Sequence, residues 1–161
     1  MKKFVAVLLL LTVVLTALSS CFEASAKDFS KAGMTITLNE NFYEKEYISY
    51  TAVYESADLA VFSLKEEKSL FEQYGYKNLS LSDYGDMVLE ANKLTANTIS
   101  QADGLYFFTY EKQANGKDFY YKAYIFAISD AFWLVQFACA ADKKDTYDSV
   151  ITEYAKSIKF E

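Results

Sequence analysis

The acidic residues are the side chains in this sequence whose type and spacing could do chemistry. Asp142, Asp145 and Asp148 recur at regular short intervals near the C-terminus, and carboxylate oxygens are the ligands that calcium prefers. The stretch lacks the Asp-x-Asp-x-Asp-Gly order and the distal Glu of a calcium loop. Acidic side chains that offset the positive end of a helix explain the spacing better. The sequence therefore predicts no metal site.

Two further acidic groups could supply the paired carboxylates of a glycoside hydrolase: Glu66 with Glu67, and Asp83 with Asp86 and Glu90. Their spacing marks no neighbour that would raise a carboxyl pKa, so solvated surface charge is the simpler interpretation. The chain also has no His and no Arg, which removes the commonest general base. We predict no catalytic residue and no cofactor. The alternative is a cell-envelope hydrolase that uses Asp or Glu.

The charge balance argues against nucleic acid as a partner. The 161 residues carry 22 acidic and 16 basic side chains, a net charge of −6. Proteins bind nucleic acid mainly by neutralising phosphates with Lys and Arg. The absence of Arg also removes the planar fork that holds phosphate or carboxylate through two hydrogen bonds.

The N-terminus has the pattern of an export signal. Lys2 and Lys3 precede an apolar run over residues 4–18, which is too short to span a membrane. The run ends in Leu18-Ser19-Ser20-Cys21, which resembles the lipobox of bacterial lipoproteins. The resemblance implies that residues 1–20 are removed and that Cys21 carries acyl chains such as palmitate. The protein would then be anchored in the cell membrane and face outside the cytoplasm.

An ordinary signal-peptidase site is the alternative at this end of the chain. Ala24-Ser25-Ala26 has the small-residue pattern that precedes such a cut, and cleavage there would release a secreted soluble protein. We favour Cys21, because a Cys at this boundary has no role in a discarded peptide. Residues 21–33 are then a lipidated N-terminus and tether, and residues 34–161 form one domain.

Three consecutive β-prone segments, residues 105–110, 119–128 and 131–139, form the predicted core. Asn115-Gly116 lies between the first two, and Asn-Gly is the strongest short hairpin signal because both residues tolerate positive φ. Ser129-Asp130 separates the second from the third. Two-residue turns at both places predict these facing pairs: Tyr110 with Tyr121, Phe108 with Ala123, Phe107 with Tyr124, Phe126 with Trp133, and Ile125 with Leu134. Both faces of this meander are apolar, so other elements must cover them.

The flanking segments supply those covers. Residues 34–38, 47–55 and 59–65 alternate as half-buried strands do, whereas residues 66–79 fit no single element. The apolar period lengthens to that of a helix after Ser80 or Ser82, either of which can cap it. A second helix is expected to start at a cap, Asp142, and to lead into an edge strand over residues 157–160. This order predicts an α+β fold in which an antiparallel sheet has helices on both faces, an α/β/α sandwich.

The same segments resemble bacterial lipoproteins with a Mog1/PsbP-like domain. The likeness spans residues 34–160 and rests on four stretches: Gly33-Met-Thr-Ile-Thr-Leu38, Asp103-Gly104-Leu-Tyr-Phe-Phe-Thr-Tyr110, Asp130-Ala-Phe-Trp133 and Ala155-Lys-Ser-Ile-Lys-Phe160. These are packing signatures. The family includes a photosystem II subunit and a Ran-binding protein, which share no activity, so the resemblance implies a fold and no function.

Function is expected to lie in surface contact. Four tyrosines stand beside charged residues at turns or in the unplaced segment, and we predict that they form the contact surface: Tyr43, Tyr47, Tyr74 and Tyr76. Core packing is the plainer role for any single ring. The predicted function is a lipid-anchored, non-catalytic binding or accessory protein, which meets an unknown envelope protein or glycan and holds the membrane through Cys21.

Lipidation makes a direct prediction about Cys21. Cys21→Ser removes the thiol that would be acylated, so we expect unprocessed precursor to accumulate and the mature membrane-anchored form to be lost. Fractionation with a mass measurement of the mature N-terminus checks this. A Cys21→Ser protein that matures normally and stays with the membrane contradicts the lipobox interpretation.

Overall fold

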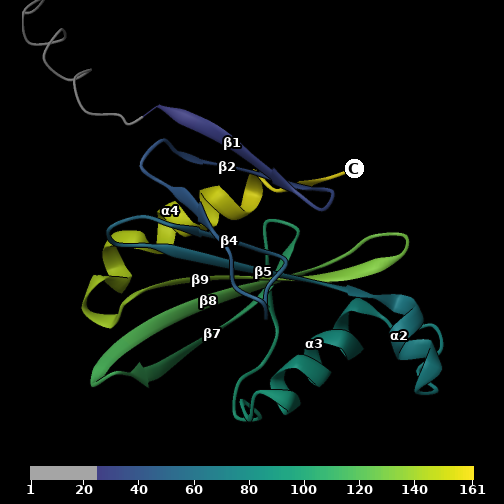
Figure 1. Cartoon of the computed structure of the whole chain (residues 1–161). Helices are drawn as coiled ribbons and strands as arrows, with labels where there is room; N and C mark the ends of the chain where they lie inside the picture. Colours follow the sequence, from purple (N-terminus) through teal and green to yellow (C-terminus); the bar gives the residue numbers. More distant parts are fainter. Residues whose placement is uncertain (1–24) are drawn as a thin grey trace, which may run out of the picture.

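The main body of the fold is one antiparallel sheet. The computed structural model describes residues 25–161; the predicted signal peptide and Cys21 lie outside the described residues. The sheet has the strand order β3-β4-β5-β9-β8-β7-β6 (Figure 1). Its strands are β3 (Tyr43–Lys45), β4 (Ala52–Glu55), β5 (Ala60–Glu67), β6 (Ser100–Ala102), β7 (Leu105–Ala114), β8 (Lys117–Ala127) and β9 (Ala131–Ala140).

A second, three-stranded sheet lies over one side of the first. It contains β1 (Ala26–Lys31), β2 (Met34–Asn39) and β10 (Lys159–Phe160), with β2 in the middle. The predicted tether over residues 21–33 is therefore too long: the fold already begins at Ala26. The sequence hid this strand because Phe29 is its one deeply buried side chain. The predicted strands at residues 34–38 and 157–160 are confirmed as β2 and β10.

The central meander has the predicted register. Tyr110 pairs with Tyr121 and Phe108 with Ala123 across β7 and β8, and Phe126 pairs with Trp133 across β8 and β9. Asn115 and Gly116 both have positive φ, 52° and 74°, as a type I′ turn requires. Because side chains alternate between faces, the register fixes which residues meet each cover.

One face of the main sheet is fully covered. The small sheet and helix α4 (Lys144–Lys156) close over it, and the core between them includes Met34, Trp133 and Cys139, all nearly inaccessible. Helix α4 contributes Tyr147, Ile151 and Ala155 to this core. The predicted cap at Asp142 is wrong. Residues Ala141–Lys143 form a short 3-10 turn, η1, and α4 starts one residue later with no side-chain cap.

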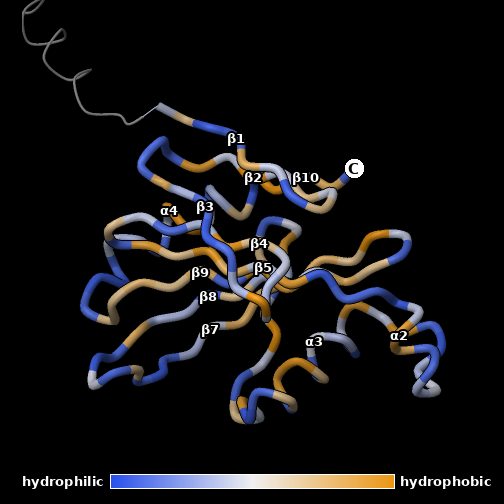
Figure 2. Tube along the Cα trace, in the orientation of Figure 1, coloured by the Kyte–Doolittle hydropathy of each residue, from blue (hydrophilic) through white to orange (hydrophobic). Residues whose placement is uncertain are grey.

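The other face is covered by α3 (Leu81–Ala91) and α2 (Lys68–Gln73). Ser80 caps α3, and its hydroxyl and the carboxylate of Asp83 form a reciprocal capping box, so of the two predicted caps Ser80 is correct. The previously unplaced residues 66–79 comprise the end of β5, then α2 and a series of turns. Figure 2 colours part of α3 as apolar, and Tyr84, Val88 and Leu89 of this helix are buried. The predicted α+β fold with helices on both sheet faces is confirmed.

One predicted strand is largely a loop. Residues 47–51 alternate in polarity like a strand, but they form a turn in which the amide of Tyr50 donates to the carbonyl of Tyr47 (3.1 Å). Strand pairing begins only at Ala52. The alternation is misleading because Ile48 is wholly exposed at the tip of the turn, while Tyr50 folds back against Phe62 of β5 (ring centroids 5.1 Å apart).

Cys139 lies on the covered face, as the register predicts. It is the free thiol of the described residues, and burial raises its pKa. Within residues 25–161, no helix has the length and apolar character needed to cross a membrane.

Candidate functional site

The four tyrosines predicted as a contact surface are all exposed, but they lie in two places. Tyr43 is on β3 and Tyr47 in the loop after it, with 51% and 46% of their surface accessible. Tyr74 and Tyr76 follow α2, beside the other end of the sheet. The structure does not bring the four together, so the two pairs are considered separately.

Tyr43 belongs to a larger aromatic surface. Residues that pair across neighbouring strands form one row of side chains on the sheet face that α3 packs against: Tyr43, Glu55, Ala60, Ala138, Tyr121 and Tyr110. The neighbouring row adds Phe62, and the loop before β4 adds Tyr47 and Tyr50. We call this surface the open tyrosine face, defined by Tyr43, Tyr47, Tyr50, Phe62, Tyr110, Phe119 and Tyr121.

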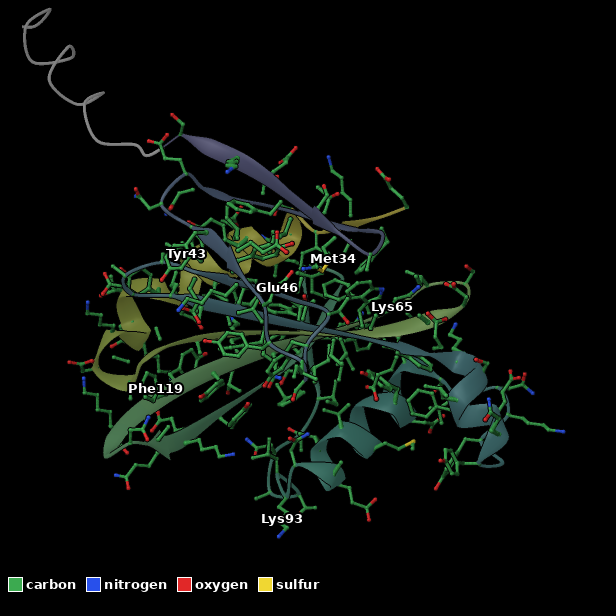
Figure 3. The ribbon with its side chains drawn as sticks, viewed as in Figure 1. Met34, Tyr43, Glu46, Lys65, Lys93 and Phe119 are labelled. Atoms are coloured by element: carbon green, nitrogen blue, oxygen red, sulfur yellow. The ribbon has the colours of Figure 1, made fainter. Side chains whose placement is uncertain are left out.

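The face is open because α3 covers only the other half of the sheet. Gly85 lets this helix approach closely: a Cβ there would lie 2.8 Å from Cδ1 of Ile125. The helix ends at Ala91, and the chain then turns back to β7, where the side-chain amide of Asn97 donates to the carbonyl of Thr109 (2.6 Å). The row that contains Tyr110 and Tyr121, next to the row of Phe108, therefore has no helix above it. Phe119, labelled in Figure 3, lies at this uncovered end, away from α2.

The rings of the open tyrosine face are held in fixed positions. Those of Tyr110 and Tyr121 stack with centroids 4.7 Å apart and planes within 1° of parallel. The Tyr110 hydroxyl reaches across the small side chain of Ala123 and donates to Oε1 of Gln136 (2.7 Å). Burial, together with the neighbouring Tyr50 phenol, raises the pKa of Tyr121, and burial also raises that of Tyr110. Both phenols stay neutral at physiological pH, so they can donate hydrogen bonds.

A hollow of about 320 Å³ indents one end of this face. Ala60 and Ala138 from adjacent strands form its floor, and Phe62, Phe119 and Tyr121 rise around them. Two turns close its ends, residues 56–59 between β4 and β5 and the turn at Asn115 between β7 and β8. Small residues beside large rings therefore create the depression.

The carboxylates at the rim of the hollow are already engaged. Glu55 pairs with Lys45 (2.6 Å) and accepts from the Tyr47 hydroxyl (3.2 Å). Asp58 pairs with Lys143 and accepts from the Tyr147 hydroxyl (2.9 Å). The hydrogen bond from Lys143 lowers the pKa of Asp58, so this carboxylate stays ionised. The carboxyl of Asp58 therefore lacks the raised pKa of a general acid.

The second exposed pair of tyrosines stands near a different hollow. Tyr76, Phe71 and Lys68 line a space of about 260 Å³ between α2 and the turn joining β8 to β9. Lys68 donates to the carbonyl of Ile128 and holds that turn. Tyr74 is 81% exposed and does not line the space. This region shows one aromatic ring at a small hollow, a weaker arrangement than the open tyrosine face.

The densest polar cluster in the described residues lies between β8 and α4. The buried ammonium of Lys122 donates to Asp148 (2.9 Å) and to the Thr152 hydroxyl (3.0 Å), and the Tyr120 hydroxyl also donates to Asp148 (2.9 Å). Burial alone would raise the pKa of Asp148, but the bonds from Lys122 and Tyr120 outweigh it and leave that pKa lowered. Every member is paired within the fold, which indicates a structural role.

Other acidic side chains considered as candidates also lie apart from one another, with separate partners in the fold. Glu66 accepts from the Tyr84 hydroxyl (2.7 Å) and thereby joins β5 to α3. Asp83 is used in the capping box. Asp148 belongs to the cluster with Lys122, apart from Asp142 and Asp145. Within residues 25–161, His, Cys, Asp and Glu side chains form no group of three that could hold a metal ion.

Comparison with known proteins identifies the fold. No family model matches the sequence, and no curated protein matches it. Among solved structures, the yeast (Saccharomyces cerevisiae) Ran-binding protein Mog1p is similar, with a TM-score of 0.54 and 10% identity over 86% of this chain and 96% of its own. Cyanobacterial PsbP from Synechocystis sp. PCC 6803 is similar too, with a TM-score of 0.50 and 13% identity over 88% of this chain and 96% of its own. The chain has the Mog1/PsbP-like fold.

A third similar structure comes from Bacteroides thetaiotaomicron VPI-5482, with a TM-score of 0.52 and 12% identity. It matches 84% of this chain but only 48% of its own length, so the Mog1/PsbP-like fold also occurs inside a larger protein. Sequence identities this low show a shared fold and not a shared function. Mog1p binds Ran, and that property belongs to Mog1p.

Sequence reasoning missed five residues of the open tyrosine face: Tyr50, Phe62, Tyr110, Phe119 and Tyr121. The predicted register places Tyr110 beside Tyr121, but the apolar pattern of both faces predicts that these two rings are covered. A usable signal is present, because Tyr110 and Tyr121 are the next residues on this face after Phe108 and Ala123. Tyrosine keeps a polar end for water where a cover stops.

The polar cluster at Lys122 gives a stability prediction. Asp148→Asn leaves a buried ammonium without its counter-charge, so we expect the free energy of unfolding at pH 7 to fall by about 1–3 kcal/mol. The folded-state pKa of Asp148 is lowered, so its contribution is present above the unfolded carboxyl pKa of about 4 and disappears as the pH falls through the folded value. Urea unfolding from pH 7 to pH 2 checks both points.

The control is Asp145→Asn, an exposed carboxylate in the first turn of the same helix. Its effect should stay within about 0.5 kcal/mol. The structural role of the cluster is wrong if the two variants lose equal stability, or if the deficit of Asp148→Asn does not shrink in acid.

Proposed function

We propose that this protein is a lipid-anchored, non-catalytic binding protein that works outside the cytoplasm of a bacterium. Its single domain recognises an envelope protein or glycan through the open tyrosine face. The observation that carries the proposal is the set of seven aromatic side chains that the fold leaves partly accessible on one sheet face. Such patches on soluble domains mark contact surfaces.

The anchor in this proposal is Cys21, and the position of β1 supports it. Cleavage after Ala26 would cut into β1, because Ala26 pairs with Asn39 and the carbonyl of Ser25 accepts from the amide of Glu40 (2.8 Å). Cleavage before Cys21 leaves the strand whole. The four Cα-to-Cα steps from Cys21 to Ser25 reach at most about 14 Å, so the domain would be held close to the membrane.

Tyrosine suits a binding role at this face. Each ring offers a large rigid contact area and a hydroxyl that donates or accepts, with few torsions to immobilise. Tyr110 and Tyr121 are already fixed by stacking, so binding costs them little conformational entropy. The carboxylates beside them are tied to lysines. The face thus offers recognition and lacks the converging acid and base of a hydrolase.

Site-specific crosslinking in living cells tests the proposal. The photoreactive residue p-benzoylphenylalanine replaces Tyr43 in one full-length variant and Tyr74 in another, since both positions are exposed tyrosines on different surfaces. We expect irradiation to yield a discrete adduct from position 43 and none from position 74. Adding Tyr47→Ser and Tyr121→Ser to the position 43 variant should abolish the adduct.

A matched background completes the design. Cys21→Ser in the position 43 variant should deplete the adduct of the mature protein, because less mature protein is then formed. Adducts only from position 74, or an adduct from position 43 that survives the two serine substitutions, would contradict the open tyrosine face as the contact surface. Turnover of a glycoside or peptide substrate by the purified protein would contradict its non-catalytic character.

A further inference from the structure

We propose that the hollow on the open tyrosine face is a binding site for an uncharged sugar ring of a glycan. This inference rests on the proposed function and specifies its ligand. It is drawn from three features of the hollow: its shape, the chemistry of its rim and its charge.

The shape suits one flat, compact unit. The volume of about 320 Å³ is at the low end for ligand sites, which run from about 300 to 1,000 Å³. Its floor is two alanines, Ala60 and Ala138, and the rings of Phe62, Phe119 and Tyr121 stand around that floor. Tyr121 is braced from behind by its stack with Tyr110, so this wall is in place before a ligand arrives.

The walls and the rim together present an amphipathic site. Aromatic faces carry partial negative charge, and the C–H groups on the flat side of a sugar ring are weakly positive, so the two attract. The rim adds side chains that donate or accept hydrogen bonds, among them Asn115 in its tight turn and the carboxylates of Glu55 and Asp58. A sugar ring has this same combination of apolar faces and a hydroxylated edge.

The charge of the site favours a neutral ligand. Both rim carboxylates already hold a lysine and a tyrosine hydroxyl, Glu55 with Lys45 and Asp58 with Lys143. A cationic ligand would have to displace these lysines, and an anionic one would meet the carboxylates. Hydroxyl groups can instead bond to the remaining lone pairs of the carboxylate oxygens without breaking either ion pair.

An apolar side chain of a partner protein is the competing occupant. It would use the aromatic walls and the alanine floor, but it would leave the rim groups without new partners and would strip water from them. The polar rim therefore favours the sugar, and the experiment must separate these two ligands.

Saturation-transfer NMR on the full-length protein, held by its anchor in phospholipid nanodiscs free of glycoside detergents, makes that separation. The probes are neutral tetrasaccharides of glucose, N-acetylglucosamine and mannose, with N-acetyl-tryptophanamide as the apolar amide. We expect at least one tetrasaccharide to receive saturation, strongest at its ring C–H protons. Any saturation that N-acetyl-tryptophanamide receives should disappear when that tetrasaccharide is added.

Two variants locate the binding. Ala60→Leu fills the hollow from a partly exposed floor position, and Tyr121→Ser removes a wall; each should weaken the sugar by about tenfold or more. Tyr74→Ser, on the other surface, should bind like the natural protein. Circular dichroism confirms that each variant is folded, and two independent changes guard against one that is not.

The sugar inference is overturned if no tetrasaccharide binds, or if both hollow variants bind a sugar as tightly as the natural protein does. Binding of N-acetyl-tryptophanamide alone, lost in Ala60→Leu, would also overturn it and would make the hollow an anchor for an apolar side chain. In each of these cases the proposed binding function is tested separately, by the crosslinking from position 43.

Discussion

The need to cover a sheet that is apolar on both faces governs this fold. Strands β7, β8 and β9 carry large apolar side chains on alternate sides, so neither face tolerates water. One face receives a complete cover, the small sheet with α4, and holds Trp133 and Phe137 fully buried. The other receives only α2 and α3, which are too short for its length.

The surface proposed for function is the remainder of that second face. Where α3 stops, Tyr110 and Tyr121 are only partly covered, and small alanines at positions 60 and 138 leave a hollow between the rings. Tyrosine tolerates partial exposure because its hydroxyl can stay in water while its ring packs. The same incomplete cover thus explains both the aromatic surface and its depression.

The parts predicted from the sequence are those set by local chemistry. The Asn115-Gly116 turn dictated the register of β7 and β8, and Ser80 with Asp83 marked the start of α3. Strand β1 is not predicted because its single buried Phe gives no periodic pattern. The loop at Ile48 is predicted as a strand because its residues alternate in polarity by chance. The extent of the α3 cover depends on its close approach at Gly85, a tertiary contact that no local pattern reveals. The apolar pattern alone therefore predicts that Tyr110 and Tyr121 are core residues.

If the open tyrosine face is the contact surface, it meets a partner in the cell envelope while the surface near α2 does not. Hydroxyl-radical footprinting of the protein in intact cells, compared with the purified protein, measures this most directly, because mass spectrometry reports oxidation residue by residue. We expect Tyr43 and Tyr47 to be protected from oxidation in cells, whereas Tyr74 and Tyr76 should react equally in both settings. Equal oxidation of Tyr43 and Tyr47 in the two samples would contradict it.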